Sequence, residues 1–215
     1  MDKYYKVNNK IEFVSKVAEL IFIDYKSSIK KNNRFNLALT GGKTPIDIYI
    51  YLRENYFSLI DWNLVYFYFV DDRDVSINSN ESNYNNAKIN LFDFLDNPNV
   101  FRFLVETNPD MAIKVYEKEI KNITINTALL GMGEDGHVGS IFPNSEELNT
   151  NSLVVHTKKK YNEYNRYSFS INTINKIENN ILIISNNRNK LEILLSEDKK
   201  YPINLIKNKK IVYYR

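Results

Sequence analysis

The chain has 215 residues, of which 43% are hydrophobic and 26% are charged, a composition typical of globular proteins and unlike that of disordered or membrane-embedded chains. Cysteine is absent, which excludes disulfides, thiolate metal sites and cysteine nucleophiles. The net charge is only +3, from 29 basic and 26 acidic residues, so the overall charge does not predict binding to nucleic acid or lipid.

The first predicted elements are a helix, a strand and a second helix. Apolar residues recur at helical spacing over residues 11–29, which predicts an amphipathic helix that covers one face of a sheet. The apolar run at 36–40 predicts a buried strand, because it is short and is stopped by two glycines. We expect Thr44 to cap the following helix, with Pro45 at its first position.

Two further predicted strands also end in polar clusters. Residues 64–70 form a strongly β-prone run that precedes an Asp-Asp-Arg sequence, and residues 127–132 precede a glycine-rich segment that ends at His137. The remaining expected elements are helices at 82–95, 109–120 and 187–195, and strands at 153–156, 166–171, 181–184 and 211–213.

The alternation of strands with helices predicts an α/β fold with a mostly parallel central sheet, whose ligands bind beyond the carboxyl ends of the strands. No repeat or linker divides the chain, so we expect a single domain over residues 1–215. The N-terminal segment has no apolar run of signal-peptide length, and no stretch approaches the roughly 18 apolar residues of a membrane span. We therefore expect a cytoplasmic protein that binds neither membrane nor nucleic acid.

The turn after the first strand has the composition of a phosphate-binding loop. Gly41 and Gly42 let the backbone approach an anion closely, and the free amides at the start of the following helix point toward it. Lys43 and the Thr44 hydroxyl could add hydrogen bonds to phosphate oxygens. An ordinary strand-to-helix turn has the same composition, so this cluster alone leaves both interpretations open.

His137 is the best candidate for a catalytic base. A neutral imidazole accepts a proton from water near neutral pH, and Asp135 could orient the ring or stabilise its protonated form. The other histidine, His156, has no such neighbours in the sequence, which favours a structural or surface role. Glycines in this segment spell a dinucleotide-binding pattern, but no helix opens at the third glycine and no acidic residue ends the next strand, so we reject that interpretation.

Several basic residues are candidates for binding an anion. Arg73 lies among three aspartates directly after the second predicted strand, a pattern that also fits a charged surface loop. Arg166 begins a predicted strand and Lys190 lies on a predicted helix, so regular structure would hold both in place. The lysines at 158–160 are better explained by solvation.

Taken in order, these stretches resemble the 6-phosphogluconolactonase family. Residues 37–45 resemble its Leu-Ser-Gly-Gly-Ser-Thr-Pro phosphate loop, with Lys43 where the family usually has serine. Residues 71–75 and 82–84 resemble its Asp-Glu-Arg-x-Val and Ser-Asn-Tyr signatures. Residues 130–143 are similar to its Gly-x-Asp-Gly-His-x-x-Ser-Leu-Phe-Pro motif, which is the most specific of the set.

The resemblance implies a modified Rossmann-like three-layer fold and the hydrolysis of 6-phospho-D-glucono-1,5-lactone in the oxidative pentose phosphate pathway, without a metal or cofactor. His137 would activate water against the lactone carbonyl, Asp135 would support it, and Arg73 would bind substrate or stabilise the developing negative charge. The implied phosphate-binding residues are Gly41, Gly42, Lys43, Thr44, Arg166 and Lys190. Because glucose-6-phosphate dehydrogenase makes this lactone, a functional or covalent association with that enzyme is also implied.

Two other functions fit parts of the pattern. The related glucosamine-6-phosphate deaminase family shares the fold, the phosphate loop and the Asp-Gly-His element, but carries a glutamate five residues after the histidine. This chain has Phe142 there, which disfavours deamination. A non-catalytic sugar-phosphate-binding protein would keep the phosphate loop and lose the base, and the presence of His137 argues against it.

Overall fold

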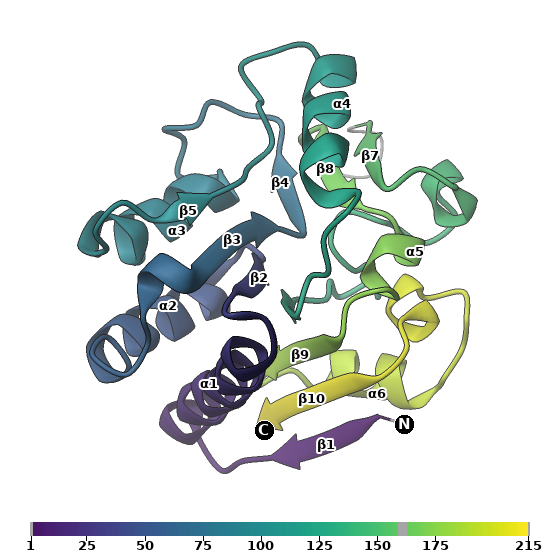
Figure 1. The fold of residues 1–215 in the computed structure, drawn as a ribbon. Coiled ribbons are helices and arrows are strands. Elements are labelled where there is room, and N and C mark those ends of the chain that lie inside the picture. Colours follow the sequence, from purple (N-terminus) through teal and green to yellow (C-terminus); the bar gives the residue numbers. More distant parts are fainter. Residues whose placement is uncertain (1, 159–162, 215) are drawn as a thin grey trace.

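The computed structural model describes residues 2–158 and 163–214, and its largest feature is a β-sheet flanked by helices (Figure 1). Among these residues the sheet has seven strands, and every adjacent pair is parallel. Across the sheet the strands are β1 (Lys3–Lys6), β10 (Lys209–Tyr214), β9 (Asn179–Ser185), β6 (Thr127–Leu130), β2 (Phe35–Leu39), β3 (Val65–Phe69) and β5 (Asn99–Val100). The predicted α/β fold with a mostly parallel sheet is confirmed.

Helices connect these strands. The α-helices are α1 (Lys10–Asn32), α2 (Lys43–Asn55), α3 (Asn83–Asn90), α4 (Pro109–Ile120), α5 (Ile171–Ile174) and α6 (Arg188–Leu195). Short 3-10 helices are η1 (Trp62–Leu64), η2 (Phe92–Phe94), η3 (Glu146–Asn149) and η5 (Pro202–Leu205). The apolar stripe of α1 is buried and packs against β2, β9 and β10, as the helical spacing predicts.

A second, antiparallel sheet stands beyond the carboxyl ends of the parallel strands. It consists of β4 (Asp71–Arg73), β8 (Arg166–Phe169) and β7 (Val154–Thr157). Val70 joins the two sheets, because its N–H donates to Leu39 O at 2.8 Å and its carbonyl accepts from Phe169 N at 2.7 Å. The chain therefore leaves β3 and enters β4 without a loop, and the polar residues that follow Val70 are held in a strand.

Local expectations differ from the structure at several places. Thr44 does not cap α2, because Gly42 is the N-cap residue, with φ of 105°, a conformation that favours glycine. The helix predicted at 82–95 ends at Asn90, since Leu91 leaves helical geometry (φ −136°, ψ −60°) before η2 begins. The polar run after Val70 is itself a strand, β4, which the sequence did not predict as one.

The two edge strands, β1 and β5, were not predicted either. β5 pairs with β3 only at Tyr66 and Phe67. Beyond this short pairing, the Tyr116 hydroxyl of α4 accepts from Phe69 N at 2.7 Å and donates to Phe69 O at 2.9 Å. A side chain thus satisfies backbone groups of β3 on the side away from β2, beyond the end of the pairing with β5.

Among the described helices, none combines the length and the apolar character needed to span a lipid bilayer.

A partly buried ion pair connects the helical layer to the sheet: Lys210 Nζ of β10 lies 2.7 Å from Asp24 Oδ1 of α1, and Asp24 is buried. Thr127 of β6 donates to the other carboxylate oxygen at 3.0 Å. Burial raises the pKa of Asp24, and the contacts with Lys210 and Thr127 oppose that rise.

Replacing Lys210 by Met should destabilise the protein by about 3 kcal/mol, because Asp24 would stay buried without its counter-charge. Urea denaturation at pH 7 measures this loss. The control Lys88→Met removes a surface ion pair with Asp93, in which both side chains are 44% exposed, and should leave the denaturation midpoint unchanged. Equal midpoints for Lys210→Met and the control would contradict the prediction.

Candidate active site

A cavity of about 280 Å³ opens where the carboxyl ends of β2 and β6 meet β4 and β8. Its position agrees with the expectation that ligands bind beyond the carboxyl ends of parallel strands. The residues that line it are Thr40, Gly41, Gly42, Asp71, Arg73, Asn83, Gly131, Met132, His137, Gly139 and Arg166. Five of the nine residues predicted as site residues are therefore brought together: Gly41, Gly42, Arg73, His137 and Arg166.

His137 is hydrogen-bonded to Asp135, which does not line the cavity. Asp135 Oδ1 lies 2.6 Å from His137 Nδ1 and also accepts the His137 backbone N–H at 3.1 Å. Because Nδ1 is occupied, Nε2 is the nitrogen available for proton transfer. Partial burial raises the pKa of Asp135, but the hydrogen bond and charge of His137 together lower it by more. The pKa therefore lies below its ordinary value. Asp135 is therefore an ionised partner for the imidazole.

Gly133 explains why this segment is rich in glycine. A Cβ at residue 133 would lie 2.1 Å from His137 Nδ1 and 2.5 Å from Asp135 Oδ1. The imidazole and the carboxylate thus pack directly on the backbone of Gly133, whose N–H donates to His137 O at 3.0 Å. The second glycine of the dinucleotide-like pattern is therefore explained by the close packing of His137 and Asp135 on residue 133. No helix follows it: η3 begins only at Glu146.

Two arginines that line the cavity lie opposite each other on neighbouring strands. Arg73 of β4 and Arg166 of β8 are direct cross-strand partners. Arg73 Nη1 donates to Glu81 O at 2.6 Å, and its Nε lies 3.5 Å from Glu81 Oε2. Arg166 is buried, and its Nε has no hydrogen-bond partner among the described residues. Like charges in this position repel, so the pair favours an anion bound between or beside them.

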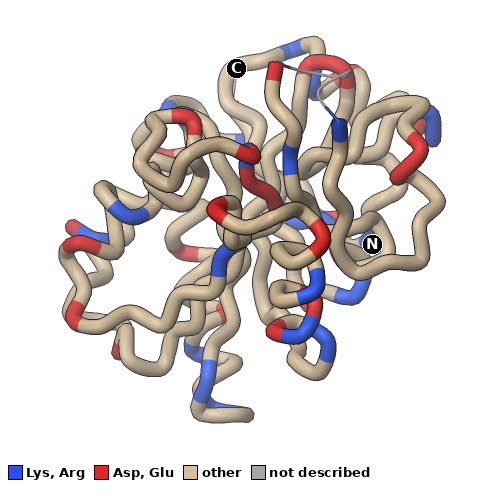
Figure 2. Tube along the Cα trace, turned by 90° about the horizontal axis from the view of Figure 1, so that it is seen from above, with Lys and Arg blue, Asp and Glu red and all other residues tan. Residues whose placement is uncertain are grey.

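Two opposing effects act on the pKa of Arg166. Burial lowers its pKa, and the nearby carboxylate of Asp71 opposes that shift. Figure 2 shows basic and acidic segments interspersed along the described part of the trace. The arginines that line the cavity and the backbone amides of the glycine turn are the local groups that favour an anion.

Asp72 caps a helix rather than facing the cavity. It accepts the backbone N–H groups of Asn83 at 2.7 Å and Tyr84 at 3.0 Å, at the start of α3. Burial raises the pKa of Asp72 to about 6, while these two N–H donors oppose the shift. The capping fixes the start of α3, from which Asn83 reaches the cavity.

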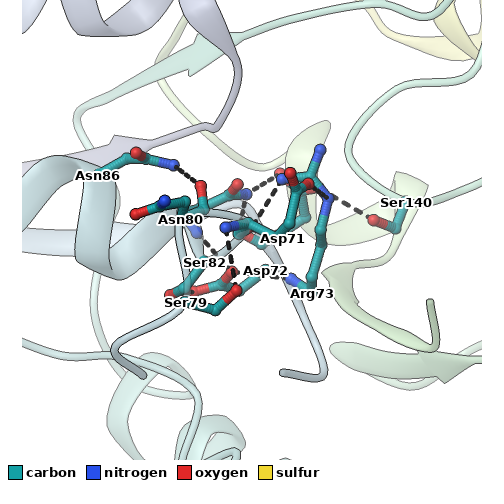
Figure 3. Close-up of polar contacts among 10 residues, drawn as sticks. Asp71, Asp72, Arg73, Ser79, Asn80, Ser82, Asn86 and Ser140 are labelled. Carbon is teal, nitrogen blue, oxygen red and sulfur yellow. Dashed lines mark hydrogen bonds and ion pairs between the residues drawn. The ribbon is translucent and has the colours of Figure 1, made fainter. Parts of the chain in front are cut away.

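Sequence reasoning missed Asp71 and Asn83 as lining residues. Asp71 Oδ2 accepts from Ser140 Oγ at 2.9 Å, a contact visible in Figure 3, and Oδ1 accepts from Thr40 Oγ1 at 3.3 Å. Asn83 Nδ2 donates to Asp71 O at 2.8 Å. A carboxylate directly after a wholly apolar strand was the available signal for Asp71; the position of Asn83 depends on the capping by Asp72.

Three predicted phosphate ligands do not line the cavity. Lys43 is exposed, and the Thr44 hydroxyl lies 2.9 Å from Ser185 Oγ at the end of β9. Lys190 of α6 is partly buried; burial lowers its pKa, and the charges of Glu134 and Asp135 oppose this. The predicted solvent-facing lysine run is described only at Lys158, which is exposed; residues 159 and 160 lie outside the described residues.

His156 has a partner that the sequence did not suggest. Its Nε2 lies 3.0 Å from Asp74 Oδ2, a residue 82 positions away, and its ring packs on Tyr167. Neither His156 nor Asp74 lines the cavity. Within the described residues, His137 is therefore the histidine positioned for chemistry.

Comparisons with known proteins agree with this geometry. A family model described as glucosamine-6-phosphate isomerases/6-phosphogluconolactonase matches residues 8–213. A 6-phosphogluconolactonase of Chlamydia pneumoniae is 35% identical over 82% of this chain and 72% of the relative. A crystal structure of 6-phosphogluconolactonase from Thermotoga maritima superposes with a TM-score of 0.89 at 25% identity, covering 100% of this chain and 99% of that one.

A human relative has a different domain context. It is called the GDH/6PGL endoplasmic bifunctional protein and is 29% identical over 89% of this chain, but the match covers only 26% of that protein.

Replacing Gly133 by Ala should separate the imidazole of His137 from Asp135, because the added Cβ would overlap both side chains. The proton in a short Nδ1–carboxylate hydrogen bond gives a strongly downfield NMR signal, which we expect to disappear in Gly133→Ala. The control Gly131→Ala should keep it, because a Cβ there meets nothing within 4 Å. Persistence of the signal in Gly133→Ala would show that the packing argument is wrong.

Proposed function

The chain belongs to the family of glucosamine-6-phosphate isomerases and 6-phosphogluconolactonases, and from this premise we propose how its cavity works as a lactonase site. The reaction is the hydrolysis of 6-phospho-D-glucono-1,5-lactone to 6-phospho-D-gluconate in the oxidative pentose phosphate pathway. The observation that carries the proposal is that the glycine turn and the imidazole of His137 line one cavity. A substrate with an anion at one end and an electrophilic carbonyl at the other can contact both.

His137 is the general base in this proposal. Its Nε2 takes a proton from water as the water oxygen attacks the lactone carbonyl carbon, and the resulting imidazolium is stabilised by Asp135. The tetrahedral intermediate then collapses, the bond from C1 to the ring oxygen breaks, and the imidazolium returns the proton to that oxygen. Arg73, on the cavity wall, stabilises the negative charge that develops on the carbonyl oxygen.

The phosphate is assigned to the part of the cavity that the glycine turn and Arg166 line. The backbone amides near Gly41 and Gly42, at the start of α2, and the guanidinium of Arg166 bind it. Lys43, Thr44 and Lys190 stay predicted phosphate contacts, although they do not line the cavity. Binding this remote group orients the lactone for attack, so its contribution to the rate is positional.

Phe142 is the observation that separates this function from deamination. Its ring centroid lies 4.6 Å from that of His137, at the position where the deaminase pattern has a glutamate. An apolar ring there cannot extend the carboxylate–imidazole pair into a relay with a second carboxylate. Hydrolysis needs only one base and a positioned water, which the pair of Asp135 and His137 supplies.

Several wider features of the proposal come from the sequence. They are a single domain over residues 1–215, a cytoplasmic location and catalysis without a metal or cofactor. Association with glucose-6-phosphate dehydrogenase is proposed because that enzyme supplies the substrate, and a related human protein is named as a bifunctional GDH/6PGL chain.

Replacing His137 by Ala should lower kcat by roughly 10²- to 10⁴-fold, the usual contribution of a general base. The rate is measured on freshly made lactone in the presence of a chelator, with the spontaneous hydrolysis subtracted. Affinity for 6-phosphogluconate should stay within a few fold, because the glycine turn and Arg166 are unchanged. The control is His156→Ala, at the histidine outside the cavity. A wild-type protein no faster than the spontaneous reaction would refute the proposed function.

Replacing Arg166 by Met should weaken binding of 6-phosphogluconate and raise KM by roughly 10- to 100-fold, the size expected for lost charge-assisted hydrogen bonds. Isothermal titration calorimetry and steady-state kinetics measure the two quantities. Arg188→Met is the matched control, since that side chain is 78% exposed on α6. Unchanged affinity in Arg166→Met would remove Arg166 from the phosphate site.

A further inference from the structure

One buried carboxylate contacts both the segment that leads into the glycine turn and the segment that follows His137. Asp71 is 5% exposed and receives a hydrogen bond from Thr40 Oγ1 at 3.3 Å on one oxygen and from Ser140 Oγ at 2.9 Å on the other. Thr40 directly precedes the glycine turn, and Ser140 follows His137 by three residues. Two segments a hundred residues apart in the chain thus bind the same side chain; Figure 3 shows the contact with Ser140.

The segment on the imidazole side forms a buried turn with its own hydrogen bonds. Val138 N donates to Ile141 O at 3.3 Å, and Ile141 N donates to Val138 O at 3.0 Å, which closes a tight turn around Ser140. Ser140 is fully buried, and its N–H donates to Ser168 Oγ at 3.0 Å. Ser140 is therefore fixed in a buried turn that begins at Val138, the residue directly after His137.

The segment on the phosphate side is held equally closely. The Tyr49 hydroxyl donates to Thr40 O at 2.6 Å. The side chain of Asn83, which donates to Asp71 O at 2.8 Å, occupies the space where a Cβ at Gly41 would lie, 1.7 Å from Asn83 Oδ1. Asp71 and its neighbour Asn83 thus fix the turn from two sides.

We propose that Asp71 and Ser140 are positioning residues that set the separation between the phosphate-binding turn and the imidazole of His137. The inference rests on the proposed function. It adds a reason why the site would be specific for substrates with one particular distance between phosphate and carbonyl. Ser140 does not line the cavity, so it acts through Asp71 and not on the substrate. Displacements of about 1 Å can lower a rate by roughly 10²-fold without abolishing binding.

The deciding variant is Ser140→Ala, which removes one hydroxyl and leaves the cavity wall intact. We expect kcat to fall by roughly 10- to 100-fold, while the inhibition constant for inorganic phosphate stays within twofold of wild type. Ser145→Ala is the matched control: Ser145 is a buried serine in the same segment, and its hydroxyl has no hydrogen-bond partner among the described residues. This control should match wild type in both quantities.

A second test uses the other arm of the connection. Thr40→Val removes the hydroxyl that reaches Asp71 from the phosphate side and should also lower kcat. If Thr40 and Ser140 both act by holding the same separation through Asp71, either substitution already breaks the connection. The kcat of the double variant should then be no lower than that of the more impaired single variant. A fold-loss of kcat in the double variant that equals the product of the two single fold-losses would overturn the proposal. If Ser140→Ala does not fold, wild-type kcat in Thr40→Val overturns it and a reduced kcat with unchanged phosphate inhibition supports it.

The outcomes separate this inference from the function on which it rests. An active wild type with an unchanged kcat in Ser140→Ala overturns the positioning role alone, as does a parallel loss of kcat and phosphate affinity. A wild type that does not accelerate lactone hydrolysis overturns the proposed function and this inference together.

Discussion

The position of Val70 between two sheets is the constraint on which the rest of the site depends. Its N–H bonds to Leu39 of β2 and its carbonyl bonds to Phe169 of β8, so the chain passes from the parallel sheet into the antiparallel one within a single residue. Asp71 is consequently buried at the junction, and Arg73 lies opposite Arg166 above the ends of the parallel strands. Without this junction the glycine turn and the arginines would face different spaces.

Near this junction the carboxylates have hydrogen-bond partners within the protein, whereas one buried arginine nitrogen has none. This difference indicates where an anionic ligand could bind. Asp72 accepts backbone N–H groups at the start of α3, and Asp71 accepts two hydroxyls, so both carboxylates have internal partners. Arg166, in contrast, is buried with an Nε that has no hydrogen-bond partner in the described part of the chain. A buried donor without a partner is costly, and an incoming phosphate oxygen would supply a partner for this Nε.

Much of the fold follows from local patterns, and the helix predicted at 109–120 has the observed bounds of α4. Periodicity succeeds there because one face of the helix is buried. It fails for β1, whose Lys-Tyr-Tyr-Lys sequence is largely exposed at a sheet edge, and for β5, which has only two residues. The pairing of Asp135 with His137 was predictable from their spacing. The contact of Asp71 with Ser140 was not, because it joins residues 69 positions apart through the topology.

The central claim is that one small molecule contacts the glycine turn and the imidazole at the same time. A crystal structure with 6-phosphogluconate bound tests it most directly. We expect the phosphate beside Gly41, Gly42 and Arg166, and the C1 carboxylate within hydrogen-bond distance of His137 Nε2. A ligand whose phosphate lies away from the glycine turn, or whose carboxylate cannot reach the imidazole, would contradict the account.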